Sequence, residues 1–161
     1  MLTPWNRISA LTVVLAGAAT LLASSPAFAS DCWLGLGPAL EAGGYSAYGP
    51  CDEDGGGVHL TYVGHTKPYR GHSYYVYNLI YTAQGDPGTA VHGGQRVLIF
   101  DSHRRYVGHY HLDTPPFRRV WVSGFDVRIN VPAGHGDRIS LKAATPPEGA
   151  MLDQDYIDLQ R

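Results

Sequence analysis

The sequence predicts an all-β protein: a small antiparallel β-sandwich of about seven strands, with a barrel as the alternative. Three observations support this fold class. Short segments rich in β-branched and aromatic residues recur from residue 58 onward. Turn-forming residues separate many of these segments, and no convincing helix separates any of them. Strands joined in this way are expected to pair antiparallel in two packed layers.

The first 29 residues are predicted to be a cleaved secretory signal peptide. Met1–Arg7 carry a single charged side chain, Ile8–Ala23 are almost wholly apolar, and Ala27-Phe28-Ala29 matches the small-residue cleavage pattern. The apolar run stops before Pro26 and is shorter than the roughly 20 residues that span a bilayer. We therefore expect a periplasmic or secreted protein whose mature chain does not insert into the membrane.

Residues 30–57 form a Gly-rich segment that contains both cysteines, Cys32 and Cys51. Asp31 stands before Cys32 where lipoproteins carry a small residue, so no lipid anchor is expected. An isolated cysteine pair in an oxidising compartment usually forms a disulfide. A Cys32–Cys51 bond would close a loop of about 20 residues and contribute about 3 kcal/mol. Within this segment, Pro38–Ala42 before Gly43 predicts one helical turn.

The charge of the mature chain argues against nucleic acid as a partner. Cleavage after Ala29 leaves 132 residues, enough for one domain with a core. Removal of Arg7 with the leader leaves 11 basic and 14 acidic residues, a net charge of −3 with histidine neutral. Phosphate binding needs a basic surface, which this balance does not favour.

The β domain is predicted to span residues 58–145. Its strands are expected at Val58–Val63, Ser73–Ala83, Arg96–Asp101, Tyr106–Leu112, Arg119–Ser123, Phe125–Val131 and Arg138–Ala143. Ser102–Arg105 is expected to be a hairpin turn. Residues 146–161 are expected to be a tail that packs on the domain, with one more short element within Met151–Leu159.

The sequence of the last two predicted strands of the domain indicates the register in which they pair with each other. Apolar and polar residues alternate in both, so their apolar faces match only in registers two residues apart. We expect Ile129 opposite Ile139 and Val127 opposite Leu141. That register also sets Asp126 against Lys142, an opposite-charge pair.

His109 and His111 form the sharpest candidate metal site. Their spacing on a strand places both imidazoles on one face, and a third ligand among His72, His92 and Asp113 would complete a site for Zn²⁺ or Cu²⁺. The alternative is a pair of partly exposed strand histidines. Pairing Asp101 with Tyr106 sets Leu98 against His109 and Arg96 against His111. A permanent cation opposite a ligand disfavours a second cation there.

Tyr75, Tyr77 and Tyr81 share one face of a strand and are the candidate binding surface. Exposed, they would form a platform for sugar rings or a protein partner, because tyrosine offers a flat apolar area with a polar tip. Buried, they would be part of the core, which is where aromatic strand residues mostly pack.

No catalytic motif is recognised in the chain. Asp101-Ser102-His103 holds the residue types of a hydrolase triad, but adjacent turn residues cannot converge from separate segments as a triad requires. The sequence therefore favours a non-enzymatic binding or structural module of the cell envelope, with a protein or glycan partner and no cofactor. The alternative is a periplasmic Zn or Cu binder that uses His109 and His111, and a small secreted hydrolase comes third.

Overall fold

The computed structural model describes residues 33–45, 57–83, 92–112, 116–130, 137–152 and 155–161. Within them lie one helix and nine strands: α1 (Gly37–Ala42), β1 (Gly57–His65), β2 (Tyr74–Ala83), β3 (His92–Asp101), β4 (Tyr106–His111), β5 (Val120–Ser123), β6 (Asp126–Ile129), β7 (Asp137–Ser140), β8 (Gly149–Leu152) and β9 (Asp155–Gln160). The predicted signal peptide, Cys32, Cys51 and Asp113 lie outside the described residues.

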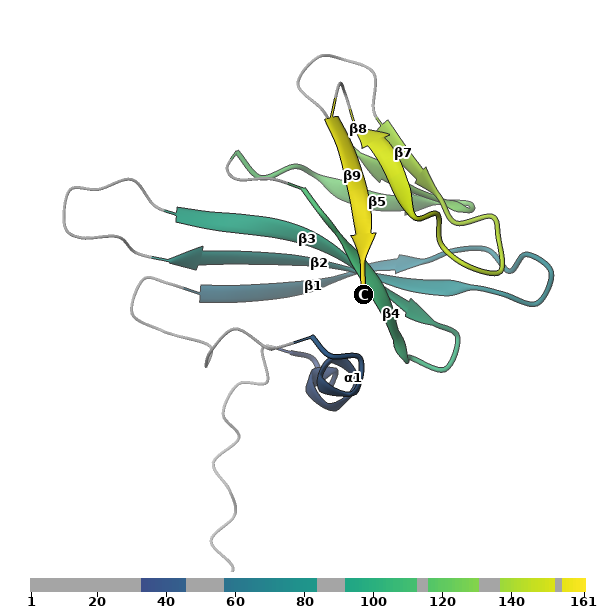
Figure 1. Ribbon diagram of the computed structural model, residues 1–161, viewed down its shortest axis with the longest axis horizontal. Helices are drawn as coiled ribbons and strands as arrows, with labels where there is room; N and C mark the ends of the chain where they lie inside the picture. The colour runs from purple at the N-terminus through teal and green to yellow at the C-terminus, as the bar shows by residue number, and fades with distance from the viewer. Residues whose placement is uncertain (1–32, 46–56, 84–91, 113–115, 131–136, 153–154) are drawn as a thin grey trace, which may run out of the picture.

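The strands form two antiparallel sheets, which confirms the predicted all-β class. The larger sheet has six strands in the order β1-β2-β3-β4-β9-β8, and the smaller has three in the order β5-β6-β7. The smaller sheet and the β8–β9 hairpin lie on one side of the long strands β1–β3, and α1 lies on the other (Figure 1). In the described part of the chain both sheets remain open, and no barrel closes. No described helix is long and apolar enough to cross a membrane.

The C-terminal tail contains two strands instead of the single short element that was predicted. β8 pairs with β9 as a hairpin, and β9 in turn pairs with β4, so the tail extends the larger sheet. Ile157 and Leu159 are buried, whereas Tyr156, Asp158 and Gln160 between and beside them are exposed. This alternation is the period-two pattern of a strand with one buried face.

The predicted register of the β6–β7 pair is wrong by two residues. Val127 lies opposite Ile139, and Ile129 lies opposite Asp137. The apolar faces still match, since a slip of two preserves them. Arg128 now faces Arg138, but the Asp126 carboxylate lies 3.4 Å from the first guanidinium and 3.6 Å from the second. Surface ion pairs contribute only about 0–1 kcal/mol each, so the predicted Asp126–Lys142 pair does not select the register.

The predicted register of the β3–β4 hairpin is confirmed at the histidines. Leu98 pairs with His109 and Arg96 with His111. Nearer the turn a bulge shifts the register, so that Tyr106 pairs with Phe100 and not with Asp101. A bulge inserts one residue and re-aims the side chains beside it.

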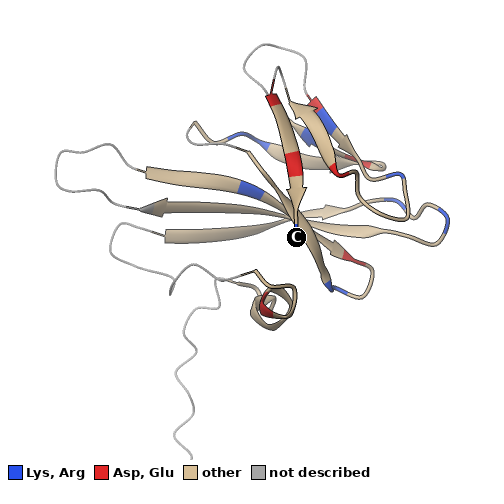
Figure 2. Ribbon diagram, viewed as in Figure 1, with Lys and Arg blue, Asp and Glu red and all other residues tan. Residues whose placement is uncertain are grey.

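The larger sheet buries a core on each of its faces. Between the two sheets lies a first core that includes Val76, Val97 and Tyr110 together with residues of β6 to β9. On the opposite face a second core packs Leu36 and Leu40, from α1 and the turn before it, against strands β1 to β3. β1 and β2 contain no Lys, Arg, Asp or Glu (Figure 2). β2 lies between the two apolar cores, whereas β1 is the edge strand of the larger sheet.

A buried glutamine joins the larger sheet to the segment that precedes β5. Gln95 is fully buried. Its amide nitrogen donates to the Asn78 side chain at 2.9 Å and to the Arg118 carbonyl at 2.6 Å. Its amide oxygen accepts from the Arg118 backbone N–H at 2.6 Å. Three groups therefore hydrogen-bond to this one side chain.

Gln95→Met is expected to lower the free energy of unfolding by about 2 kcal/mol, because it removes three part-buried hydrogen bonds while nearly preserving volume. Urea denaturation followed by circular dichroism measures the loss. Asn130→Met, at an exposed position just after β6, is the control and should stay within about 0.5 kcal/mol of the parent. Equal effects of the two variants would contradict the structural role of Gln95.

Candidate functional site

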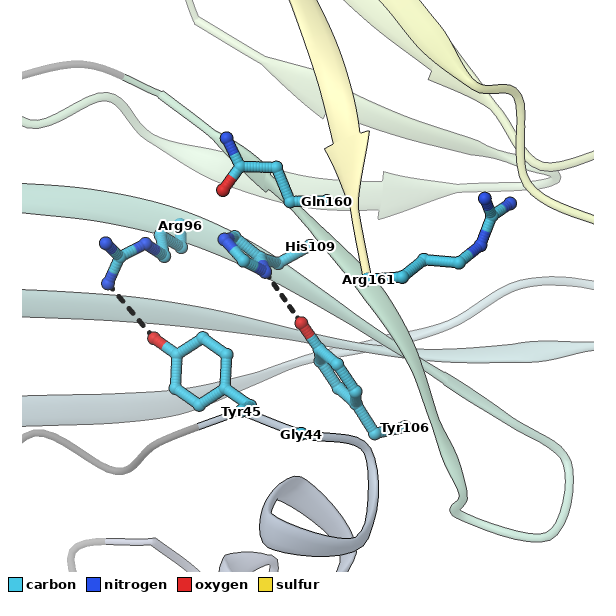
Figure 3. Close-up of a pocket in the computed structure, with 7 residues that line it drawn as sticks. All are labelled: Gly44, Tyr45, Arg96, Tyr106, His109, Gln160 and Arg161. Carbon is cyan, nitrogen blue, oxygen red and sulfur yellow. Dashed lines mark hydrogen bonds between the residues drawn. The ribbon is translucent and has the colours of Figure 1, made fainter.

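A cavity of about 220 Å³ opens on the face of the larger sheet that carries α1. Four parts of the chain line it: the segment after α1, β3, β4 and the end of β9. The described lining residues are Gly44, Tyr45, Arg96, Tyr106, His109, Gln160 and Arg161 (Figure 3). Because strands and a helix end hold most of these side chains, the cavity is built on rigid elements.

The end of α1 brings Tyr45 to the cavity. Gly44 adopts a left-handed φ of 78°, which glycine tolerates without a steric penalty. The Tyr45 N–H then donates back to the Leu40 carbonyl at 2.9 Å, which closes the helix end. Gly43 lies so close to the Tyr106 ring that a β-carbon there would overlap it. These two glycines therefore let the chain turn and approach β4 closely.

Arg96 places a permanent positive charge in the wall of the cavity. The residue is only 9% exposed. Its Nη1 donates to the Tyr45 hydroxyl at 3.0 Å, and its guanidinium lies over the rings of Tyr45 at 5.9 Å and Tyr81 at 5.0 Å. Cation–π contacts of this kind stabilise a guanidinium that has lost water. A guanidinium does not lose its proton in proteins, so the charge persists at every working pH.

His109 is a neutral member of the cavity wall. Its Nδ1 lies 2.6 Å from the Tyr106 hydroxyl. Burial, with electrostatic contributions from Arg96 and His111, lowers the pKa of His109 to about 4, and a hydrogen bond with Gln160 partly opposes this shift. Burial also raises the pKa of Tyr106 well above 10. At neutral pH the imidazole is therefore uncharged and the phenol protonated.

The lining is suited to holding a ligand more than to transforming one. None of the seven described residues is Ser, Thr, Cys, Lys, Asp or Glu. A base whose pKa is about 4 accepts protons poorly near neutral pH. The lining therefore offers a cation, neutral hydrogen-bonding groups and aromatic surface, with no activated nucleophile.

The three predicted tyrosines do not form a single exposed platform. Tyr77 is buried and packs edge-on against Phe100, with ring centroids 5.4 Å apart. Tyr81 is half-buried and faces Arg96. Tyr75 is half-buried under the guanidinium of Arg104, which lies 5.4 Å from its ring. Tyr77 is therefore a core residue, Tyr81 lies beside Arg96, and Tyr75 makes a contact with Arg104 at the surface.

The two predicted metal-binding histidines have different surroundings. His109 lines the cavity, and His111 lies opposite Arg96 across the strand pair. His72 lines a different cavity, and His92 begins β3 opposite Ala83. Within the described ranges no three His, Cys, Asp or Glu side chains gather as a metal-binding group.

A second cavity, of about 390 Å³, contains His72 and the Asp101-Ser102-His103 sequence. Asp101 serves the hairpin turn, since one of its oxygens accepts from the backbone N–H groups of His103 and Arg105 at 2.8 and 2.9 Å. Its other oxygen accepts from the Arg105 side chain at 2.7 Å. Partial burial raises the pKa of Asp101, but these hydrogen bonds outweigh it and hold the pKa below its ordinary value. Asp101 is therefore a turn carboxylate.

Sequence reasoning did not identify Tyr45, Tyr106 or Gln160 as members of a site. The one available signal was the glycine pair before Tyr45, which marks the end of a helix but not its neighbour in space. No protein-family model, curated protein or solved structure matches the chain.

Proposed function

We propose that this protein is an exported, non-enzymatic binding module whose ligand occupies the cavity lined by Tyr45, Arg96, Tyr106 and His109. The observation that carries the proposal is the convergence of these polar and aromatic groups from separate segments into one cavity, whose described lining residues include no activated nucleophile. A few convergent polar groups between aromatic walls are typical of small-ligand sites.

The proposed place of action rests on the N-terminal pattern and on the cysteine pair. A leader that ends at Ala29 sends the mature chain to the periplasm or the medium, where a Cys32–Cys51 disulfide would persist. A protein or glycan partner in the envelope is a further part of the proposal. Tyr62 and Tyr75 offer such a partner an aromatic surface, with ring centroids 6.4 Å apart.

Titration of the ¹⁵N-labelled exported chain with a library of small fragments tests the proposal. Fragments that bind should shift the backbone amides of Gly44, His109 and Gln160, with Kd values on the order of 1 mM for ligands of this size. Gln160→Trp should abolish these shifts, because the larger side chain fills the cavity from an exposed position. Asp158→Trp, on the same face of the same strand, is the matched control and should preserve them. Fragment shifts confined to other surfaces would contradict the proposal.

A divalent metal site at His109 and His111 is the second candidate. The supporting observation is the Nε2 atom of His111, which is buried and has no hydrogen-bond partner within the described part of the chain. Zn²⁺ added in the same titration should then shift the His109 and His111 ring signals, and His111→Ala should remove that response. The positive charge of Arg96 opposite His111 makes this the weaker candidate.

A further inference from the structure

We infer that the outer face of the smaller sheet binds an acidic polysaccharide, one whose sugar rings carry carboxylates. The smaller sheet lies on the side of the long strands opposite α1 (Figure 1), whereas the cavity of the proposed function opens on the α1 side. The inference therefore goes beyond that function, since it concerns a second surface and a different class of ligand. Three features support it: the alignment of the outward side chains, their charge, and an exposed indole beside hydroxyl groups.

The strands of the smaller sheet direct one set of side chains into the core and the other set outward. Val127 and Ile139 are fully buried in the first core, so the alternate side chains of β6 and β7 face away from it. The register sets Trp121 of β5 opposite Arg128 of β6, and Arg128 opposite Arg138 of β7. An indole and two guanidinium groups thus form a row across three strands that are spaced about 4.8 Å apart.

The outer face carries more positive than negative charge, although the chain as a whole has a net charge of −2. Arginines lie on or beside all three strands (Figure 2): Arg119, Arg128 and Arg138. Among the described outward side chains of these strands, Asp126 is the only acid, and its Oδ2 lies 3.4 and 3.6 Å from the guanidinium groups of Arg128 and Arg138. Charge-assisted hydrogen bonds are shorter, roughly 2.7–2.9 Å. One carboxylate therefore offsets only part of this charge, and directly opposed like charges destabilise a sheet. Carboxylates of a ligand would relieve that repulsion.

The neighbours of the arginines favour a sugar as the carrier of those carboxylates. Trp121 is 36% exposed, and the Arg119 guanidinium lies over its ring at 5.9 Å. An exposed indole offers a flat apolar surface, against which the C–H face of a sugar ring can pack. In the adjacent row Ser123 lies opposite Asp126, and Asp126 lies opposite Ser140. Both serines are exposed. Their hydroxyls donate and accept hydrogen bonds, and the carboxylate accepts them, as sugar hydroxyls require. An acidic peptide would use the arginines but has no pyranose ring to place on the indole.

Three matched probes separate the sugar from its charge. Tetragalacturonate carries four carboxylates, its fully methyl-esterified form carries none, and N-acetylated, C-amidated tetraglutamate carries four without sugar rings. Each is titrated into the ¹⁵N-labelled exported chain at pH 7 and low salt. Tetragalacturonate should shift the Trp121 indole N–H and the backbone amides of Arg128 and Arg138. It should bind at least about tenfold more tightly than the ester and at least about fivefold more tightly than tetraglutamate.

Each contrary result overturns a defined part of the inference. Equal affinity for the ester would exclude recognition of charge, and equal affinity for tetraglutamate would exclude recognition of the sugar. Absence of shifts with tetragalacturonate would exclude the surface as a whole. The fragment titration of the cavity follows the amides of Gly44, His109 and Gln160, so failure of the proposed function is distinguishable from failure here.

Two variants test the residues assigned to this surface. Arg138→Gln should weaken tetragalacturonate binding at least about fivefold. Arg104→Gln removes the same charge from the β3–β4 turn, where the guanidinium lies over Tyr75, and should change the affinity less than about twofold. Trp121→Ala should weaken tetragalacturonate binding at least about fivefold and tetraglutamate binding less than about twofold. Arg138 and Trp121 are exposed, so both variants are expected to fold. Unchanged tetragalacturonate affinity in either one would overturn the inference.

Discussion

Phe100→Ala is expected to lower the free energy of unfolding by about 4 kcal/mol, the largest effect of any substitution considered. Phe100 is fully buried in the second core. Its ring packs edge-on against Tyr77 at 5.4 Å and against Tyr106 at 5.7 Å. Alanine would remove the buried ring, leave a cavity and abolish both aromatic contacts. Urea denaturation monitored by tyrosine fluorescence measures the loss.

An exposed aromatic residue is the matched control. It shows whether the loss of stability comes from the burial of Phe100 or from the removal of any aromatic side chain. Trp121 on β5 is 36% exposed, so Trp121→Ala should cost less than about 1 kcal/mol. A loss below about 1 kcal/mol from Phe100→Ala as well would show that the second core contributes little to stability, in conflict with its burial.

The same substitution connects the core to the cavity. Phe100 supports the ring of Tyr106, and the Tyr106 hydroxyl bonds His109. The side of the cavity formed by Tyr106 and His109 is therefore supported by the core beneath it. This arrangement explains how a chain with few charges on its central strands can still position an arginine and a histidine accurately.

The sequence predicted the strands well because period-two patterns and turn residues are local. All seven expected strands exist, with ends that differ by a few residues. The β6–β7 register failed because it was chosen by exposed charges, which contribute too little to select between registers. The β8–β9 hairpin was underestimated because Asp155 and Asp158 interrupt a short apolar pattern.

The cavity could not be predicted, because its members meet only through tertiary structure. Tyr45 and Arg96 are 51 residues apart in sequence, and Gln160 follows His109 by about as many. Whether they meet depends on how α1 crosses the sheet and on the pairing of β9 with β4. His109 was identified from its spacing with His111, yet its closest partner is the Tyr106 hydroxyl, on the same strand. Period two places residues 106 and 109 on opposite faces, and the bulge beside Phe100 accounts for the difference.

Acidification is expected to destabilise the protein through His109. In the unfolded chain this histidine has a pKa of 6.5, and in the folded chain burial, Arg96 and His111 lower the pKa to about 4. Between these values the unfolded chain binds a proton that the folded chain does not bind, so stability falls as the pH is lowered from 6.5. The full shift corresponds to about 3 kcal/mol, most of which is lost by pH 4.5. Urea denaturation at pH 7.0, 5.5 and 4.5 measures the change.

His109→Gln isolates this contribution, because glutamine keeps hydrogen-bonding capacity and does not titrate. The variant should lose about 2–3 kcal/mol of the pH dependence between 7.0 and 4.5, whereas His103→Gln, at an exposed turn position, should retain it. Measurements stop at pH 4.5 because the pKa values of Asp101 and Glu148 are held below their ordinary range. Their contributions are lost only as the pH falls further, toward their folded pKa values. An unchanged pH profile in His109→Gln would mean that the imidazole is not buried against Arg96, and the neutral state assigned to His109 in the cavity wall would then be wrong.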